Sequence, residues 1–158
     1  MEVSEILSAF AADIGLDGLE PDADGVFHLG VDDMSIEFAE LKETRQLVTF
    51  AEVGEPPAGC RDRLYRVLME AMFMGRATNG AMFSVPVGGE TICLQRVDEL
   101  ATLELDGFKA TLEAFVNDLE RWKKFVAEFK DVAAAIDADK DQKAAELRKF
   151  GLGEGIWG

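Results

Sequence analysis

Residues 71–97, AMFMGRATNGAMFSVPVGGETICLQRV, decide the fold that this sequence predicts. The stretch begins at the end of an apolar helix, passes through a glycine-containing turn and enters two apolar segments that Gly88 and Gly89 separate. A glycine pair between two such segments is a strong hairpin signal, because glycine adopts the backbone angles that tight hairpin turns require. We therefore expect two strands, at about 81–87 and 91–97.

The helix that precedes this turn is expected at about 61–74, and apolar residues cover most of its circumference. A helix of this kind is buried on two sides. The sheet of a chain this small can cover one side, so a second subunit is the expected cover of the other side.

The remaining segments predict a helix, three strands and a long helix. The expected ranges are 2–15 for the first helix, 26–29, 34–38 and 47–53 for the strands, and a last helix from an Asp106 N-cap to about 129. The sequence thus predicts an α+β fold, with an antiparallel, twisted sheet of about five strands and three helices in the order α-β-β-β-α-β-β-α. We expect one domain over 1–129 and a helical or flexible tail over 130–158.

Composition is that of an ordinary globular domain. The chain has 158 residues, of which 48% are hydrophobic and 30% charged, and this length is enough to bury a core without disulfides or metals. No run of about 18 apolar residues occurs, and the start MEVSEILSAF is acidic and amphipathic, unlike a signal peptide. We therefore expect a cytoplasmic protein with no membrane contact, in which Cys60 and Cys93 are reduced.

The net charge of −15 is unevenly distributed. Residues 1–58 contain 14 acidic and 2 basic side chains, a net charge of −12, which leaves −3 for residues 59–158. An acidic surface repels phosphate backbones and anionic lipids, so nucleic acids and membranes are excluded as expected partners. Two interpretations remain open: the acidic third keeps the protein soluble, or it steers a basic client.

Catalytic chemistry finds little support in the sequence. His28 is the only histidine, and its possible nucleophile partners are Cys60 and Cys93. The turn at 75–80 resembles a phosphate loop, but Ala81 stands where the loop needs lysine. The acidic residues near the first strand lack the spacing of a calcium loop. We expect no enzymatic activity, no metal and no cofactor, and a small enzyme that uses His28 with Cys60 or Cys93 is the rival hypothesis.

Three segments, in this order, resemble the class I chaperones of bacterial type III secretion, the family that includes the Tir chaperone. They are LSAFAADIGL at 7–16, LMEAMFMGRATNGAMFSVPVGGETICLQRV at 68–97, and FKATLEAFVNDLERWKKFV at 108–126. In the last segment Phe115 precedes Trp122 by seven residues, a pattern that is similar to the closing helix of the family. The resemblance covers roughly residues 1–129.

The resemblance implies a bacterial cytoplasmic homodimer that binds the N-terminal segment of a type III secretion effector or another secreted protein. Such a chaperone keeps its client non-globular and delivers it for export without ATP hydrolysis of its own, with the secretion ATPase as a further candidate partner. Clients of the family wrap around the dimer and add a strand to its sheet. The dimer-interface residues that the resemblance implies are Leu64, Leu68, Met69, Met72 and Phe73.

Apolar residues on the second and third strands and the first helix exceed what one small core needs, and an extended client can place alternate side chains in such surfaces. The candidate client-binding residues are Leu7, Phe10, Ile36, Phe38, Val48 and Phe50. The alternative for each of them is that it is a core residue. The alternative for the whole protein is an adaptor or regulatory module of the same fold that binds a folded signalling or secretion-apparatus partner.

Overall fold

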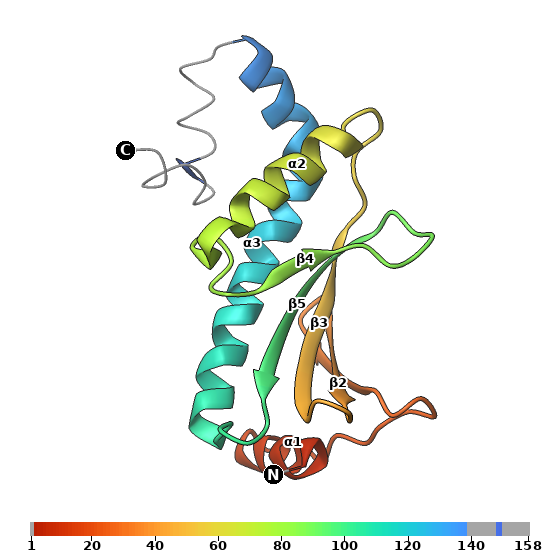
Figure 1. The fold of residues 1–158 in the computed structure, drawn as a ribbon, viewed down its shortest axis with the longest axis vertical. Coiled ribbons are helices and arrows are strands. Elements are labelled where there is room, and N and C mark those ends of the chain that lie inside the picture. Colours follow the sequence, from red (N-terminus) through yellow and green to blue (C-terminus); the bar gives the residue numbers. More distant parts are fainter. Residues whose placement is uncertain (1, 139–147, 150–158) are drawn as a thin grey trace. The chain divides into compact units, whose positions relative to one another are not determined.

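The computed structural model of the chain describes residues 2–138, 148 and 149, and its helices and strands follow the predicted order (Figure 1). The elements are α1 (Val3–Asp13), β1 (Phe27–Val31), β2 (Met34–Leu41), β3 (Gln46–Gly54), α2 (Arg61–Met72), the 3₁₀ turn η1 (Phe73–Gly75), β4 (Met82–Ser84), β5 (Ile92–Glu99) and α3 (Leu105–Ala138). The five strands form one antiparallel sheet in the order β1-β2-β3-β5-β4. The predicted fold class is confirmed.

The chain forms two compact units. Unit 1 consists of Met1–Glu52 and Gln95–Val116, and unit 2 of Val53–Leu94 and Asn117–Gly158. The strands β1 and β2, most of β3, the second half of β5 and the start of α3 belong to unit 1. The helix α2, the strand β4, the first half of β5 and the rest of α3 belong to unit 2. Each unit has its own aromatic cluster.

Unit 1 is built on the β1–β2 hairpin and the two helices that carry aromatic rings. Asp32 lies at the hairpin turn with a left-handed φ of 53°, a conformation that aspartate tolerates better than most residues. The ring of Phe108 packs edge-on against Phe10 at 5.3 Å between centroids and lies 5.8 Å from Phe38. These contacts bury the apolar stripe of α1, which begins after Glu2 with a capping box to Glu5.

The strands of unit 1 alternate as the sequence predicts. In β3, Leu47, Thr49 and Ala51 are buried, whereas Val48 and Phe50 are half-exposed. Side chains that point to opposite sheet faces explain this period of two. One face of the sheet therefore covers the unit 1 core, and the other face keeps apolar side chains at the surface.

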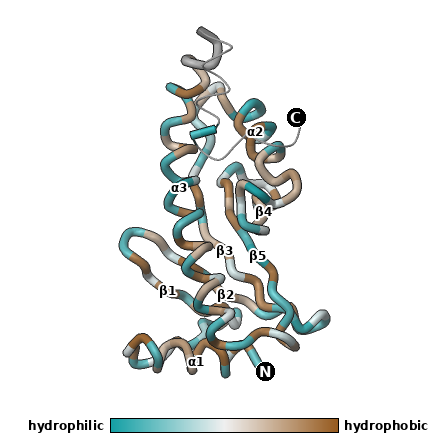
Figure 2. The backbone as a smooth tube through the Cα atoms, turned by 90° about the vertical axis from the view of Figure 1, so that its left-hand side faces the viewer, coloured by the Kyte–Doolittle hydropathy of each residue, from teal (hydrophilic) through white to brown (hydrophobic). Residues whose placement is uncertain are grey.

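Unit 2 is built around the part of α3 that follows Val116. Trp122, Phe125 and Phe129 are fully buried, and their rings contact one another edge-on along the helix, with Phe83 of β4 packed against Trp122 at 4.9 Å. Figure 2 shows the corresponding alternation of hydrophobic and hydrophilic residues along α3. This stripe forms the core on which unit 2 is assembled.

Several predicted boundaries differ from those of the structure, and three of the differences have a local explanation. The helix predicted to reach Met74 ends at Met72, because Met74 has a left-handed φ of 60° that a helix cannot continue through. The strand predicted for 81–87 covers Met82–Ser84 only. Asp106 is not the N-cap of α3 but lies in its first turn, since the N–H of Phe108 already donates to the carbonyl of Glu104.

The hairpin between β4 and β5 has a wider loop than a two-residue turn. At its tip the N–H of Gly89 donates to the carbonyl of Pro86 at 3.0 Å, and Gly88 has a φ of 77°. A positive φ at the third residue but not at the second, Val87, is that of a type II turn, which explains the glycine there. The strand signal of residues 85–87 therefore belongs to a loop.

The domain boundary that we expect at residue 129 stays a prediction, and α3 continues through it to Ala138. Most of the tail predicted for 130–158, residues 139–147 and 150–158, lies outside the described residues. Among the helices that the structure describes, none has the length and apolar character needed to span a bilayer.

Candidate functional site

The helix α2 has one buried face and one exposed apolar face. Leu64, Leu68 and Ala71 point into unit 2 and are almost completely buried. On the other side Met69 keeps 68% of its surface exposed, and Phe73, just after the helix, keeps 52%. Large apolar side chains at such exposure are common one at a time but informative when they cluster.

A small apolar groove lies beside this exposed face, between α2, the end of β4 and the start of β5. Its volume is about 160 Å³, and its lining residues are Tyr65, Leu68, Met69, Met72, Phe83, Ser84, Val85 and Ile92. The N–H of Phe83 donates to the sulfur of Met72 at 2.9 Å, and the hydroxyl of Tyr65 donates to the carbonyl of Glu90 at 2.9 Å. These two bonds tie α2 to β4 and to the loop that precedes β5, so they fix the helix beside the hairpin.

Further exposed apolar residues continue from the groove along β4 and the hairpin loop. Met82 and Val85 are about two-fifths exposed, and Val87 at the loop tip is fully exposed. We define the unit 2 apolar surface as the groove together with Met69, Phe73, Met74, Met82, Val85 and Val87. Met74, Met82, Val85 and Val87 were not predicted as site residues from the sequence, although the position of Val87 between Pro86 and Gly88 in a turn favoured its exposure.

A polar cluster on α3 fixes the turn that joins α2 to β4. Asp118 is buried, and its carboxylate accepts from the side chains of Asn79 at 2.7 Å and Arg121 at 2.9 Å. Arg121 also donates to the backbone carbonyl of Ala77. Bonds to a charged, buried carboxylate are stronger than neutral ones, and the cluster therefore sets the position of η1 and β4 within unit 2.

The five residues expected at a dimer interface occupy different places in unit 2. Leu64 and Leu68 belong to its core, Met72 is half-buried in the groove wall, and Met69 and Phe73 are exposed. A side chain that is already buried has little surface left to give to a second subunit. Of the five residues, Met69 and Phe73, with the half-buried Met72 beside them, therefore remain candidates for a dimer interface.

The six candidate client-binding residues all lie in unit 1. Leu7, Phe10, Ile36 and Phe38 are buried in its core, at 6% exposure or less. A client cannot contact them unless the unit opens. Val48 and Phe50 are half-exposed on the outer sheet face, opposite Ala39 and Glu37 of β2, so the structure narrows the client-binding hypothesis to these two positions.

The strands β1 and β4 form the two edges of the sheet. On β1, Pro21 makes an antiparallel bridge with Phe27, and the N–H of Asp22 donates to the carbonyl of Val26 at 2.8 Å. The segment before β1 thus covers the first position of this edge. The rest of the strand, up to Val31, pairs with β2 on one side and lies at the sheet edge on the other, the position at which an extended chain can add a strand.

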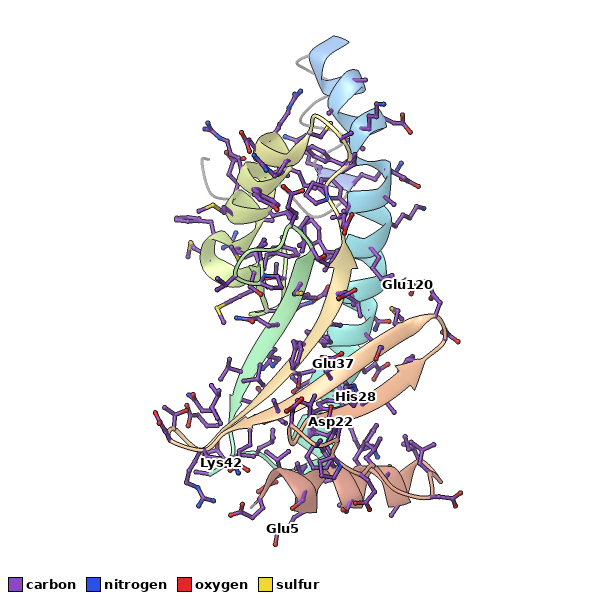
Figure 3. The ribbon with its side chains drawn as sticks, turned by 90° about the vertical axis from the view of Figure 1, so that its right-hand side faces the viewer. Glu5, Asp22, His28, Glu37, Lys42 and Glu120 are labelled. Carbon is purple, nitrogen blue, oxygen red and sulfur yellow. The ribbon has the colours of Figure 1, made fainter. Side chains whose placement is uncertain are left out.

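His28 lies on β1 between two carboxylates, as Figure 3 shows. Its Nε2 is 2.8 Å from Asp22, to which it donates a hydrogen bond, and its Nδ1 is 3.7 Å from Glu37. The hydrogen bond from His28, followed by one from the Val26 N–H, lowers the pKa of Asp22 below its ordinary value. His28 belongs to unit 1, whereas Cys60 and Cys93, which form no disulfide bond, belong to unit 2.

The two units differ in net charge. Unit 1 has 18 acidic and 4 basic residues, a net charge of −14, and unit 2 has 13 acidic and 12 basic residues, a net charge of −1. The unit with the exposed apolar side chains of α2 and β4 is therefore almost neutral, and the unit that contains β1 carries nearly all of the negative charge.

Comparisons with known proteins agree with this fold. The structure is similar to a chain in the crystal structure of the ExsC-ExsE complex, with a TM-score of 0.66 and 23% identity over 80% of this chain and 97% of that one. It is also similar to a chain of the HopA1-SchA chaperone-effector complex, with a TM-score of 0.63 and 11% identity over 76% and 91% of the two chains. A third likeness is to the heterodimeric ExoU-SpcU complex of the Pseudomonas aeruginosa type III secretion system, with a TM-score of 0.60 and 13% identity over 76% and 97%.

No curated protein matches the sequence well enough to count as a relative. The family model of the Tir chaperone protein (CesT) family, in contrast, matches residues 5–123. This match spans both units, from α1 to the aromatic stretch of α3, and covers three quarters of the chain. The chain belongs to the Tir chaperone protein (CesT) family.

Proposed function

We propose that this chain is a homodimeric chaperone that binds the N-terminal segment of a type III secretion effector or another secreted protein. It keeps that segment non-globular and delivers it for export without using ATP. Membership of the Tir chaperone family is the observation that carries this proposal. The likeness to chains in complexes described as chaperone-effector and type III secretion complexes supports it.

The unit 2 apolar surface supports self-association. Association is stabilised when contiguous apolar side chains such as Met69 and Phe73 are removed from water, by about 25 cal/mol per Å² of apolar area buried. Methionines suit an interface of this kind, because an unbranched side chain adapts to the surface it meets. The near-neutral charge of unit 2 adds no strong repulsion between two copies.

Unit 1 supports client binding in two ways. The edge of β1 offers backbone donors and acceptors to an extended client, and Val48 and Phe50 offer apolar surface on the outer sheet face. The net charge of −14 on this unit favours the steering interpretation of the acidic region, since it attracts basic segments and speeds their encounter.

We further propose that the chain has no enzymatic activity and works in the bacterial cytoplasm, with the secretion ATPase as a further partner. The position of His28 beside Asp22 and Glu37 supports a structural role for this histidine, since both ring nitrogens face carboxylates of the same unit. Replacing His28 by alanine should leave client binding intact.

The test is affinity capture of the tagged chain from native cytosol, with mass spectrometry of the bound protein and of the intact complex. We expect two copies of this chain with one copy of an exported protein, held through its N-terminal region and unaffected by ATP. A bound partner that is folded and never exported would instead favour the adaptor function. A monomeric chain would contradict the proposed dimer.

A further inference from the structure

The turn that joins α2 to β4 contains Asn79 followed by Gly80, and both residues have a left-handed backbone. The φ angle is 48° at Asn79 and 84° at Gly80. Asparagine tolerates this conformation better than most residues do, and glycine adopts it freely. Asn79 also supplies the side-chain amide that donates to Asp118 at 2.7 Å. The backbone angles and this hydrogen bond together favour an asparagine-glycine pair at the turn.

An asparagine followed by a glycine is also chemically labile. The backbone nitrogen of Gly80 can attack Cγ of Asn79, because glycine has no side chain that hinders the approach. A bond between this nitrogen and Cγ forms, the bond between Cγ and Nδ2 breaks, and ammonia leaves with the proton of the backbone nitrogen. Water then opens the resulting cyclic imide at either of its two carbonyl groups, which yields aspartate or isoaspartate.

Two hydrogen bonds of the folded chain occupy the two groups that must react. The side-chain amide of Asn79 is held on the carboxylate of Asp118, and the N–H of Gly80 donates to the carbonyl of Gly75 at 3.2 Å. Ring closure requires both bonds to break. Asn79 and Gly80 are exposed, so burial does not keep water from them. Any protection of this pair therefore depends on the two hydrogen bonds.

We propose that Asn79 is a deamidation site, which Asp118 protects while it holds the amide and which reacts when the turn opens. The product cannot restore the closed turn. An aspartate at position 79 has no side-chain N–H to donate and brings a second negative charge toward the buried carboxylate of Asp118, and an isoaspartate adds a carbon atom to the backbone. Deamidation thus makes the opening of the turn irreversible, and unit 2 loses a bond that positions η1 and β4.

The chain contains an internal control for this reaction. Its two asparagines are Asn79 and Asn117, and both are exposed. Asn117 lies within α3 and is followed by Asp118, so its backbone is fixed by helical hydrogen bonds and the nitrogen that would attack carries a bulky side chain. We therefore expect deamidation at Asn79 and not at Asn117.

The first test follows the full chain during incubation in mildly alkaline buffer, with and without urea. Trypsin separates the two asparagines into peptides 77–96 and 110–121, and mass spectrometry measures the replacement of an amide NH₂ by OH in each peptide. Because a hydrogen bond to a charged partner must break, Asn79 should react at least about tenfold more slowly in the folded chain than in urea. Equal rates in the two conditions would overturn the protection.

The second test compares two variants in buffer without urea, with thermal unfolding as the check that each is folded. Asp118→Ala should raise the deamidation rate of Asn79 at least about tenfold. The matched control is Val132→Ala, which removes buried apolar volume from α3 about 20 Å further along the helix and leaves the bond to Asn79 in place. Its rate should stay close to that of the wild type. An equal acceleration in both variants would show that the reaction follows general unfolding, and would overturn the assigned role of Asp118.

A third measurement tests the product and does not depend on the Asp118 variant. Asn79→Asp carries the aspartate that deamidation yields, and its Tm should fall by about as much as that of Asp118→Ala, because the same hydrogen bond is lost. An Asn79→Asp chain as stable as the wild type would show that the turn closes equally well around the product, and would overturn the irreversibility.

Discussion

Met69→Glu is expected to convert the proposed dimer into a folded monomer. Burying a methionine side chain contributes about 1.5–3 kcal/mol, and Met69 has 68% of its surface left to bury. Complete burial in a second subunit would therefore contribute about 1–2 kcal/mol per copy and about 2–4 kcal/mol for a symmetric pair. At about 1.4 kcal/mol per factor of ten, losing this term raises the dimer dissociation constant about 30- to 1000-fold.

Because Met69 is exposed within its own unit, Met69→Glu tests the interface more selectively than Met72→Glu does. Met72 is half-buried and its sulfur accepts a hydrogen bond from Phe83, so a carboxylate there damages unit 2 as well as the interface. At Met69 the carboxylate stays in water in the monomer and costs the fold little. The loss of association can therefore be assigned to the interface alone.

Sedimentation velocity over a dilution series gives the dissociation constant, and the thermal midpoint at low concentration reports the stability of the monomer. Leu41→Glu is the matched control, since Leu41 is a large exposed apolar residue of unit 1 at 46% exposure. A Met69→Glu chain that dimerises as tightly as the wild type would show that this face of α2 is not the interface.

Three further predictions test the core, the polar cluster and the edge of β1. Phe38→Asp should unfold unit 1, because a fully buried ring is lost at about 3–5 kcal/mol and an unpaired charge is added, whereas Phe50→Asp should fold normally and weaken client capture; circular dichroism and a capture assay separate the two outcomes. Asp118→Ala should lower the free energy of unfolding by about 2 kcal/mol, because charged hydrogen bonds to Asn79 and Arg121 are lost. The expected fall in Tm is about 4–8 °C, and an unchanged Tm would contradict the stabilising role of the polar cluster. His28→Ala should raise the pKa of Asp22 toward its ordinary value, measured by NMR titration of the carboxyl carbon, and an unmoved midpoint would refute the assigned cause.

The sign of the Asp22 effect follows from linkage. The folded chain holds the pKa of this carboxyl below its unfolded value, so its contribution to stability is present above the unfolded pKa and is lost as the pH falls through the folded pKa. The segment that Asp22 holds on the edge of β1 should therefore loosen only in acid. At neutral pH the bond between Asp22 and His28 stays in place.

Local sequence patterns were sufficient for the order of the elements. The alternation of Met34, Ile36 and Phe38 with polar residues predicts a strand with one buried face, and all three are buried. Helical spacing predicts α3 through Trp122 and Phe129 in the same way. Each pattern arises because the apolar residues of one element are buried in the core of its own unit, and such burial leaves a regular spacing of apolar residues in the sequence.

Element ends depended on interactions that a local pattern does not contain. The helix before the turn ends at Met72 because the backbone reverses at Met74, in a turn that Arg121 and Asp118 hold from a distant part of the chain. Asn79, which bonds to Asp118, also adopts a left-handed φ. Nothing in residues 61–74 alone distinguishes a continuing helix from one that stops.

The site residues were harder to predict, because a surplus of apolar residues does not say which of them the core uses. Leu7, Phe10 and Phe38 are used by the core, since Phe108 from α3 packs against the two aromatic rings. In α2 the apolar pattern covers two sides, and only the structure shows that Leu64 and Leu68 face inward while Met69 faces outward.

The distribution of charge gives a physical reason for placing the two proposed binding surfaces on different units. Two copies that met through unit 1 would bring net charges of −14 together, whereas two copies that meet through unit 2 bring together net charges of −1. Self-association is thus least opposed where Met69, Phe73 and Val87 are exposed. In the proposed assembly unit 1 is left for a client, and its net charge of −14 would favour a basic segment and oppose contact with unit 1 of a second copy. Raising the salt concentration should therefore weaken client capture more than it weakens the dimer, because screening acts on the charge-driven contact and leaves the apolar one in place.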